Sequence, residues 1–361
     1  MNESRLTGTV RIIGAGLLGT SIGLALAKHN VDVVIEDSSP ANQSLAIDYG
    51  AGRRPASNDT PSLIVVCVPP DVTANVILAE LASFPEATVT DVASVKFEIL
   101  QQLERSGENL KNYVGSHPMA GRERGGAIAG RADLFVGRPW VIAAHANSER
   151  TSISKVEALA LELGAAPMAT TPAEHDRAVA LVSHVPQLVS SLLAARLVGA
   201  APEDVALAGQ GLRDTTRIAA SDPKLWLQIL DSNAQEVSGV LKAFALDLDQ
   251  VIDALDHIDQ SGSLAKLGRA LEAGNRGVER IPGKHGSKAT AYSQVIVMIA
   301  DKPGELGRLF NEVGEIGVNI EELKLEHSPS SLIGLVELFV LPQAESQLVD
   351  ELVARGWRLA G

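Results

Sequence analysis

Near its beginning, the chain carries a glycine-rich loop between an apolar run and a predicted helix. Gly14, Gly16 and Gly19 form a Gly-x-Gly-x-x-Gly pattern that follows residues 10–13 and opens a helix predicted over 17–28. The first glycine allows a tight turn, the second lets a pyrophosphate approach the backbone, and the third lets the helix pack closely on the strand. A helix amino-terminus also offers free N–H groups to phosphate. The loop therefore predicts a dinucleotide site formed by Gly14, Gly16, Leu17, Leu18 and Gly19, with an ordinary tight turn as the alternative.

Two acidic residues end the second predicted strand, at 31–35. Glu36 lies about 20 residues beyond the loop, where an acidic side chain binds the ribose hydroxyls of a dinucleotide. Asp37 would repel a 2′-phosphate, and the Ser-Ser-Pro that follows brings no cation. The pattern predicts NAD rather than NADP, with Glu36 on the ribose. Two solvated acids at a strand end are the alternative.

The order of elements predicts an α/β Rossmann-type doubly wound parallel sheet, followed by an all-helical domain and a small α+β domain. Apolar runs at 63–68, 88–92 and 140–144 predict further strands within residues 1–172. Helical periodicity dominates residues 173–281, a predicted substrate and dimerisation domain, with helices at 173–181, 185–197, 202–217, 223–246 and 251–275. Residues 282–290 are a predicted linker. Residues 291–361 have a predicted strand-helix-strand-strand-helix order. We expect the last strand of this domain, which would follow the second helix, to be truncated.

Charge and cysteine content restrict the class of protein. The chain has 44 acidic and 31 basic side chains, for a net charge of -13. Such a charge disfavours nucleic acid and anionic membrane surfaces as partners. The single cysteine, Cys67, excludes an intrachain disulfide and favours a reducing, cytoplasmic location. No unbroken apolar run approaches the roughly 18 residues of a membrane span, and no metal-binding motif is present.

Two residues in the first domain are candidates for catalysis. His117 lies in a Pro/Gly-rich segment, 115–121, that is predicted as a loop after a strand. Ser94 follows the strand at 88–92 and should lie at the carboxyl edge of the sheet, which faces the ligand in open α/β folds. A histidine can accept a hydroxyl proton and a serine can orient that hydroxyl. A histidine that only braces the loop is the alternative.

Candidate substrate-binding residues lie in the helical block. Arg213 and Arg217 are four residues apart and share a helix face if the helix is continuous. Guanidinium groups suit carboxylates, although a solvated face would show the same spacing. His184 lies at a predicted helix start and is either a site residue or a structural histidine. Trp226 is more typical of a core.

Together these segments resemble the prephenate/arogenate dehydrogenase family over about residues 8–281. The resemblance rests on the glycine loop and on segments 91–96, 115–121, 183–186 and 216–223, with Trp226. It implies NAD-dependent oxidative decarboxylation of prephenate to 4-hydroxyphenylpyruvate in tyrosine biosynthesis, or of arogenate to tyrosine. By this resemblance His117 takes the proton of the substrate 4-hydroxyl, Ser94 hydrogen-bonds that hydroxyl or His117, Arg217 binds a carboxylate and His184 helps to hold the side chain. Some members carry a second histidine where this chain has Gln187, which leaves the choice between prephenate and arogenate open.

The last segment resembles an ACT domain. The resemblance rests on residues 301–306 and 317–320, and it implies a tyrosine effector and a homodimer. A dimerisation module without a ligand is the alternative for this segment. For the whole chain, the alternatives are a β-hydroxy-acid dehydrogenase and a non-catalytic amino-acid-sensing protein. The former would need a catalytic lysine, and neither Lys224 nor Lys242 is distinctive.

Overall fold

The computed structural model describes residues 4–121, 125–282, 292–327 and 333–360. The chain divides into two compact units, 1–244 and 245–361. The division falls within helix α11 (Ala234–Asp256), so the predicted helical block contributes residues to both units. The predicted linker lies outside the described residues except for Pro282. The predicted domain boundaries stay a prediction.

The first unit is built on a seven-stranded sheet of order β2-β1-β3-β4-β5-β6-β7. Its strands are β1 (Thr9–Ile13), β2 (Val33–Glu36), β3 (Pro61–Val66), β4 (Thr88–Asp91), β5 (Tyr113–Pro118), β6 (Pro139–Ala143) and β7 (Ala166–Thr170). Strands β1 to β5 are parallel, as predicted. The expectation of a wholly parallel sheet is wrong at one place, because β6 runs antiparallel to β5. Strand β7 was not predicted, since its side chains are mostly exposed and show no buried apolar run.

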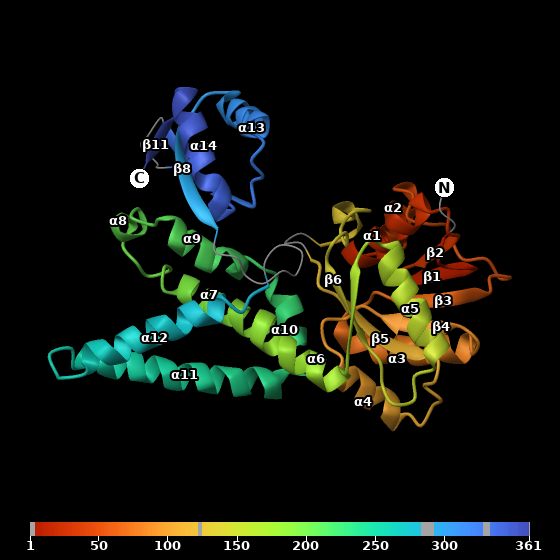
Figure 1. The fold of residues 1–361 in the computed structure, drawn as a ribbon. Coiled ribbons are helices and arrows are strands. Elements are labelled where there is room, and N and C mark those ends of the chain that lie inside the picture. Colours follow the sequence, from red (N-terminus) through yellow and green to blue (C-terminus); the bar gives the residue numbers. More distant parts are fainter. Residues whose placement is uncertain (1–3, 122–124, 283–291, 328–332, 361) are drawn as a thin grey trace. The chain divides into compact units, whose positions relative to one another are not determined.

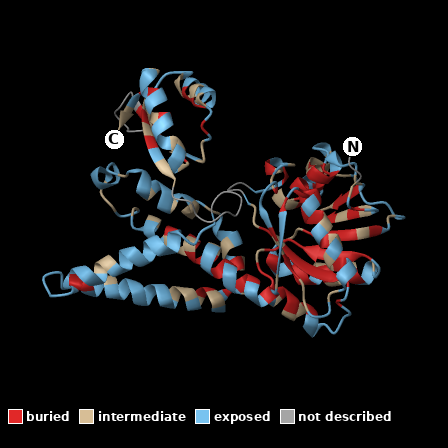
Figure 2. Ribbon diagram, viewed as in Figure 1, coloured by how far each residue is buried: buried red, intermediate tan, exposed pale blue. Residues whose placement is uncertain are grey.

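Helices cover both faces of this sheet (Figure 1). Side chains of α1 (Leu17–Lys28), α2 (Pro40–Asp48) and α5 (Arg150–Glu162) share one buried cluster with the sheet. Side chains of α3 (Pro70–Ser83), α4 (Phe97–Arg105) and α10 (Pro223–Ser232) share a second cluster with its other face. Figure 2 shows the resulting buried strands between more exposed helices. A short 3-10 turn, η1 (Ala127–Ala129), packs near α1.

A long helical run follows the sheet. Helix α6 (Pro172–Val179) begins with a capping box between Thr171 and Glu174, continues through a π-helical turn, η2 (Ala180–His184), and passes into α7 (Val185–Ala195). By length and composition alone, the run Pro172–Ala195 could cross a membrane, with a mean hydropathy of 1.6. A core helix of a globular protein passes the same test, and this run carries polar side chains that are hydrogen-bonded inside the fold.

Three helices predicted as continuous are broken. The segment 202–217 forms α8 (Pro202–Val205), α9 (Gln210–Thr216) and the start of a 3-10 turn, η3 (Arg217–Ala219). The segment 223–246 is interrupted at Asn233, between α10 and α11. The segment 251–275 turns before α12 (Ser263–Val278), where Gly262 has a φ of 94°. Apolar periodicity continues across each break, so periodicity alone did not reveal them.

The second unit holds a four-stranded antiparallel sheet of order β11-β8-β10-β9. Its elements are β8 (Ser293–Ala300), α13 (Glu305–Ile316), β9 (Glu322–His327), β10 (Ile333–Val340), α14 (Pro342–Ala354) and β11 (Arg358–Ala360). Helices α13 and α14 share one apolar cluster with the sheet. The predicted α+β order is confirmed, and the last strand is short but pairs with β8.

Candidate active site

Three candidate segments meet one edge of the parallel part of the sheet. Strands β1, β4 and β5 are parallel, so their carboxyl ends lie at the same edge. The glycine loop follows β1 and Ser94 follows β4. His117 was predicted in a loop but lies within β5, where it pairs with Val141 of β6. Carboxyl edges of such sheets are where ligands bind.

The glycine loop has the geometry that a dinucleotide requires. Gly14 has a φ of 104°, and a Cβ added there would lie 2.4 Å from the carbonyl oxygen of Cys67. A Cβ on Gly19 would lie 1.9 Å from the carbonyl oxygen of Gly14. At Gly16 an added Cβ would meet nothing within 4 Å, so the backbone is open to a ligand at the start of α1. The loop therefore fits a pyrophosphate.

The two acids after β2 have different partners. Asp37 faces the glycine loop: its Oδ2 accepts the Ala15 backbone N–H at 2.7 Å. Glu36 instead accepts from Nη2 of Arg11 at 2.6 Å, and Arg11 also pairs with Glu80 at 2.9 Å. The expectation that no cation lies near these acids is therefore wrong, because the sheet brings Arg11 beside Glu36. The role of Glu36 on the ribose stays a prediction.

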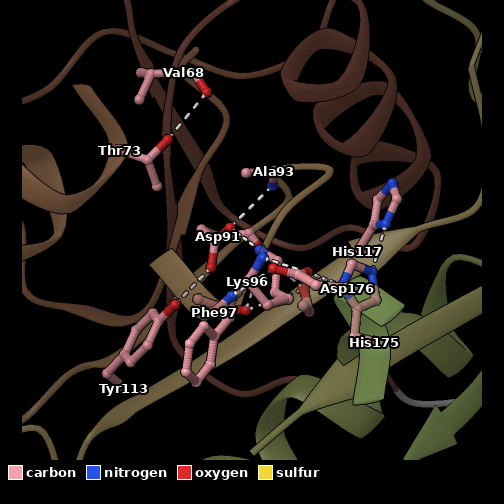
Figure 3. A network of polar contacts seen from close by, with 12 residues as sticks. Val68, Thr73, Asp91, Ala93, Lys96, Phe97, Tyr113, His117, His175 and Asp176 are labelled. Atoms are coloured by element: carbon pink, nitrogen blue, oxygen red, sulfur yellow. Dashed lines mark hydrogen bonds and ion pairs between the residues drawn. The ribbon is translucent and has the colours of Figure 1, made fainter. Parts of the chain in front are cut away.

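His117, His175 and Asp176 form a row of three hydrogen-bonded side chains (Figure 3). In this row, the ring of His117 is in contact with that of His175. Nδ1 of His117 lies 2.9 Å from Nε2 of His175, and Nδ1 of His175 lies 2.7 Å from Oδ1 of Asp176. His175 and Asp176 are buried on α6. The other ring nitrogen of His117 points away from His175. The row thus connects the edge of the sheet with the helical run.

The Asp176 carboxylate also closes the amino-terminus of α4. It accepts the backbone N–H groups of Lys96 at 2.8 Å and Phe97 at 2.9 Å. A carboxylate only accepts hydrogen bonds, so Nδ1 of His175 carries a proton, and in the neutral tautomer of this ring Nε2 accepts one. Nδ1 of His117 is then the donor, and its Nε2 carries the ring's lone pair. We assign these tautomers from the hydrogen-bond network.

Electrostatics keep the His117 ring neutral. Burial lowers its pKa well below the ordinary value, and His175, the Lys96 ammonium and His184 lower it further. A neutral ring with its lone pair on Nε2 is a proton acceptor. The arrangement can therefore act as a general base.

A buried ion pair supports the loop that carries Ser94. Lys96 and Asp91 are 1% and 0% exposed and form an ion pair. Asp91 also accepts from the Tyr113 hydroxyl at 2.8 Å and from the Ala93 backbone N–H at 2.9 Å. Burial lowers the pKa of Lys96 and raises that of Tyr113. Removing one partner from such a pair typically costs about 3–5 kcal/mol, so this pair holds the segment 91–96 rigidly.

His184 belongs to the same polar network as His117. It is buried at the end of the π-helical turn, and its ring meets Trp226 edge-on with centroids 5.9 Å apart. Asn233 lies 3.1 Å from its Nδ1 and also donates to the backbone carbonyl of Asp176 at 2.8 Å. Burial lowers the pKa of His184 to about 4, so its ring is neutral near pH 7. Turns of this π-helical type occur often at functional sites.

The remaining predicted residues are less closely connected. Ser94 is half-buried between β4 and α4. Arg213 on α9 and Arg217 in η3 are exposed, and both elements pack against α7. Gln187 of α7, which follows segment 183–186, accepts from the Ser221 hydroxyl of segment 216–223 at 3.5 Å. That Arg217 binds a substrate carboxylate stays a prediction.

Sequence reasoning missed His175, Asp176 and Asn233. His175 and Asp176 are adjacent in the first turn of a predicted helix, and this His-Asp pair is a sequence signal for a polar contact near the site. Asn233 gave no signal, because it lay inside a helix predicted as continuous.

Two family models match the chain. One is described as the nucleotide-binding domain of prephenate dehydrogenase and matches residues 22–168. The other is described as the dimerization domain of prephenate dehydrogenase and matches residues 171–270. The first covers most of the sheet with its helices, and the second covers the helical run that supplies His175, Asp176 and His184.

Known proteins match over longer spans. The chain is 36% identical over 356 residues to a probable prephenate dehydrogenase, NovF, of Streptomyces niveus, covering 97% of this chain and 98% of that protein. The arogenate dehydrogenase structure from Synechocystis has a TM-score of 0.62 at 25% identity, covering 74% of this chain and 99% of that one. A prephenate dehydrogenase structure from A. aeolicus, in complex with hydroxyphenyl propionate and NAD+, has a TM-score of 0.68 at 24% identity, covering 76% and 99%.

Proposed function

Because this chain belongs to the prephenate dehydrogenase family, we propose that it catalyses the NAD-dependent oxidative decarboxylation of prephenate to 4-hydroxyphenylpyruvate. The observation that carries the proposal is the row His117–His175–Asp176, which engages Nδ1 of His117 and makes Nε2 its acceptor nitrogen. The nucleotide-binding fold supplies the cofactor site, and the A. aeolicus structure with NAD+ supports NAD as the dinucleotide.

His117 performs the proton step. Its Nε2 takes the proton of the substrate 4-hydroxyl as the carbinol C–H bond breaks and a carbonyl forms. The glycine loop would hold NAD, which would supply the hydride acceptor for that carbon. The ring carboxylate then leaves as CO2, its bonding electrons aromatise the ring, and the resulting phenolate oxygen takes the proton back from His117 to give the phenol. Such a base typically contributes about 10²–10⁴-fold to the rate.

The chain's own residues would hold the substrate at both ends. Arg217 is proposed to bind a carboxylate, for which its planar guanidinium is suited, and Ser94 to orient the hydroxyl. Arg213 and Trp226 are proposed to line the same site. His184, whose ring is neutral near pH 7, is proposed to donate from Nε2 to a carbonyl oxygen of the side chain. Prephenate offers a keto oxygen on its side chain, whereas arogenate offers an ammonium, which has only N–H donors. This difference supports prephenate.

Regulation and assembly form part of the proposal. The match to a dimerization domain supports a homodimer. The strand and helix order of the described part of residues 292–360 supports an ACT-like module, and tyrosine is proposed as its effector. Family membership and the single cysteine support a cytoplasmic location.

A four-way assay tests the function. Prephenate and arogenate are each combined with NAD+ or NADP+, with and without tyrosine, and the appearance of reduced dinucleotide is followed. The proposal expects the highest kcat/KM for prephenate with NAD+. A higher kcat/KM for arogenate would make arogenate the substrate instead of prephenate. No turnover of either compound would refute the proposed activity.

A further inference from the structure

Asn233 occupies the break between helices α10 and α11 and is only 5% exposed. Its side-chain amide lies between two groups of the candidate site. Nδ2 donates to the backbone carbonyl of Asp176 at 2.8 Å and lies 3.1 Å from Nδ1 of His184. A buried amide that contacts both segments is a candidate for a specific electrostatic role.

The amide can point only one way. If its oxygen and nitrogen were exchanged, the oxygen would face the Asp176 carbonyl, and two acceptors would meet without a proton. The contact with Asp176 therefore fixes Nδ2 as the atom that faces His184. Because Nδ2 is a donor, Nδ1 of His184 must accept, and the ring proton must lie on Nε2.

We propose that Asn233 is a positioning residue that holds His184 as the neutral Nε2–H tautomer, the form that donates to an acceptor on the substrate side chain. This rests on the proposed function only for the identity of the acceptor. Asp176 and His175 of α6 also act on His184: the Asp176 charge favours the imidazolium and His175 opposes it. His117 lies in the same network, and the uncharged Trp226 covers the ring from α10. Asn233 is the neighbour that distinguishes one tautomer from the other.

The tautomer can be measured on the free protein. The full chain is labelled with 15N-histidine, and the ring nitrogens of His184 are assigned by comparison with His184→Gln. We expect a pyridine-like Nδ1 and a pyrrole-like Nε2 at neutral pH. A pyrrole-like Nδ1 would overturn the proposal without any variant at position 233.

Two substitutions test whether Asn233 sets the tautomer of His184. Asn233→Ala removes the donor, so both tautomers of His184 should become populated. Asn233→Asp places a carboxylate beside Nδ1, which should move the proton to Nδ1 and raise the titration midpoint of His184 by about 1–3 pH units. If both variants fold, as judged by circular dichroism, and keep the wild-type tautomer and midpoint, the proposal is wrong.

A matched control makes the same change elsewhere. Asn112 is also buried, and its Nδ2 donates to the Pro85 carbonyl at 2.7 Å. Asn112→Asp should leave the His184 spectrum unchanged, and a shift there equal to that of Asn233→Asp would refute a specific effect. Because these readings need no substrate, failure of the proposed activity in the four-way assay remains distinguishable from failure of the role of Asn233.

Discussion

The Nδ1 atom of His117 and the Nε2 atom of His175 lie 2.9 Å apart, and the two rings meet edge to face with centroids separated by 5.1 Å. One proton lies between them, donated by His117. When His117 accepts a second proton at Nε2, this bond becomes charge-assisted and therefore stronger. The pair thus stabilises the ring more after proton transfer than before it, as catalysis requires.

Replacing His175 should slow the reaction without weakening dinucleotide binding. A hydrogen bond to a charged group contributes about 1.5–3 kcal/mol, so His175→Gln should lower kcat roughly 10- to 150-fold. His117→Asn should lower it by about 10²–10⁴-fold. Steady-state kinetics and NAD+ titration by intrinsic fluorescence measure both effects. His145, which stacks on Tyr113 outside the network, supplies the control His145→Gln. Near-normal turnover of His117→Asn would remove that residue from its role.

Acid should destabilise the protein through its buried histidines. The pKa of His117 is well below 6.5 in the fold and that of His184 is about 4, whereas unfolded histidines titrate near 6.5. Between these values the unfolded chain binds more protons, so the free energy of unfolding is full above about pH 6.5 and falls as the pH drops toward 4. Urea titrations over this range measure the loss. His184→Gln should flatten the dependence, whereas a change at the exposed His257 should not. An equal slope in both variants would contradict this account.

The two acids after β2 should differ in their effect on NAD+ binding. Asp37 faces the glycine loop, while Glu36 is held by Arg11. Asp37→Ala removes the charge-assisted hydrogen bond between the carboxylate and the Ala15 N–H of the glycine loop. We therefore expect it to raise the Kd for NAD+ by about 10- to 150-fold. Glu36→Gln should change the Kd less. Calorimetric titration of both variants decides the matter. A larger rise in Kd for Glu36→Gln than for Asp37→Ala would support the predicted contact of Glu36 with the ribose.

Arg217 should affect substrate binding more than folding. If its guanidinium binds a substrate carboxylate, Arg217→Ala should raise KM for prephenate by about tenfold or more and leave the thermal midpoint nearly unchanged, because the residue is exposed. Arg213→Ala, at the exposed arginine of α9, shows whether another arginine of this segment has the same effect. An unchanged KM in Arg217→Ala would exclude the carboxylate contact.

Local signals predicted the parts of the fold that depend on neighbours in sequence. The helix after the glycine loop spans Leu17–Lys28 as expected, because glycine geometry and apolar spacing act within one turn. The reversed strand β6 was not predictable in this way, since strand direction is set by partners far along the chain. The breaks at Asn233 and Gly262 were missed because apolar spacing continues through them.

The candidate site was predicted only in part for the same reason. His117 and His184 are marked by their motifs, and the structure places both in one polar network. The partner of His117, which lies on strand β5, is 58 residues away on helix α6. No local pattern pairs two such residues, and only docking of α6 against the sheet brings them together.

The double acceptance of backbone amides by Asp176 has a consequence for dissection of the chain. Its carboxylate completes the first turn of α4 from outside the nucleotide-binding region. A shortened polypeptide ending before α6 would leave those amides uncapped and the imidazole of His117 without its tether. We therefore expect the nucleotide-binding region alone to lack an oriented base at His117. The proposed reaction requires α6 to pack against the sheet.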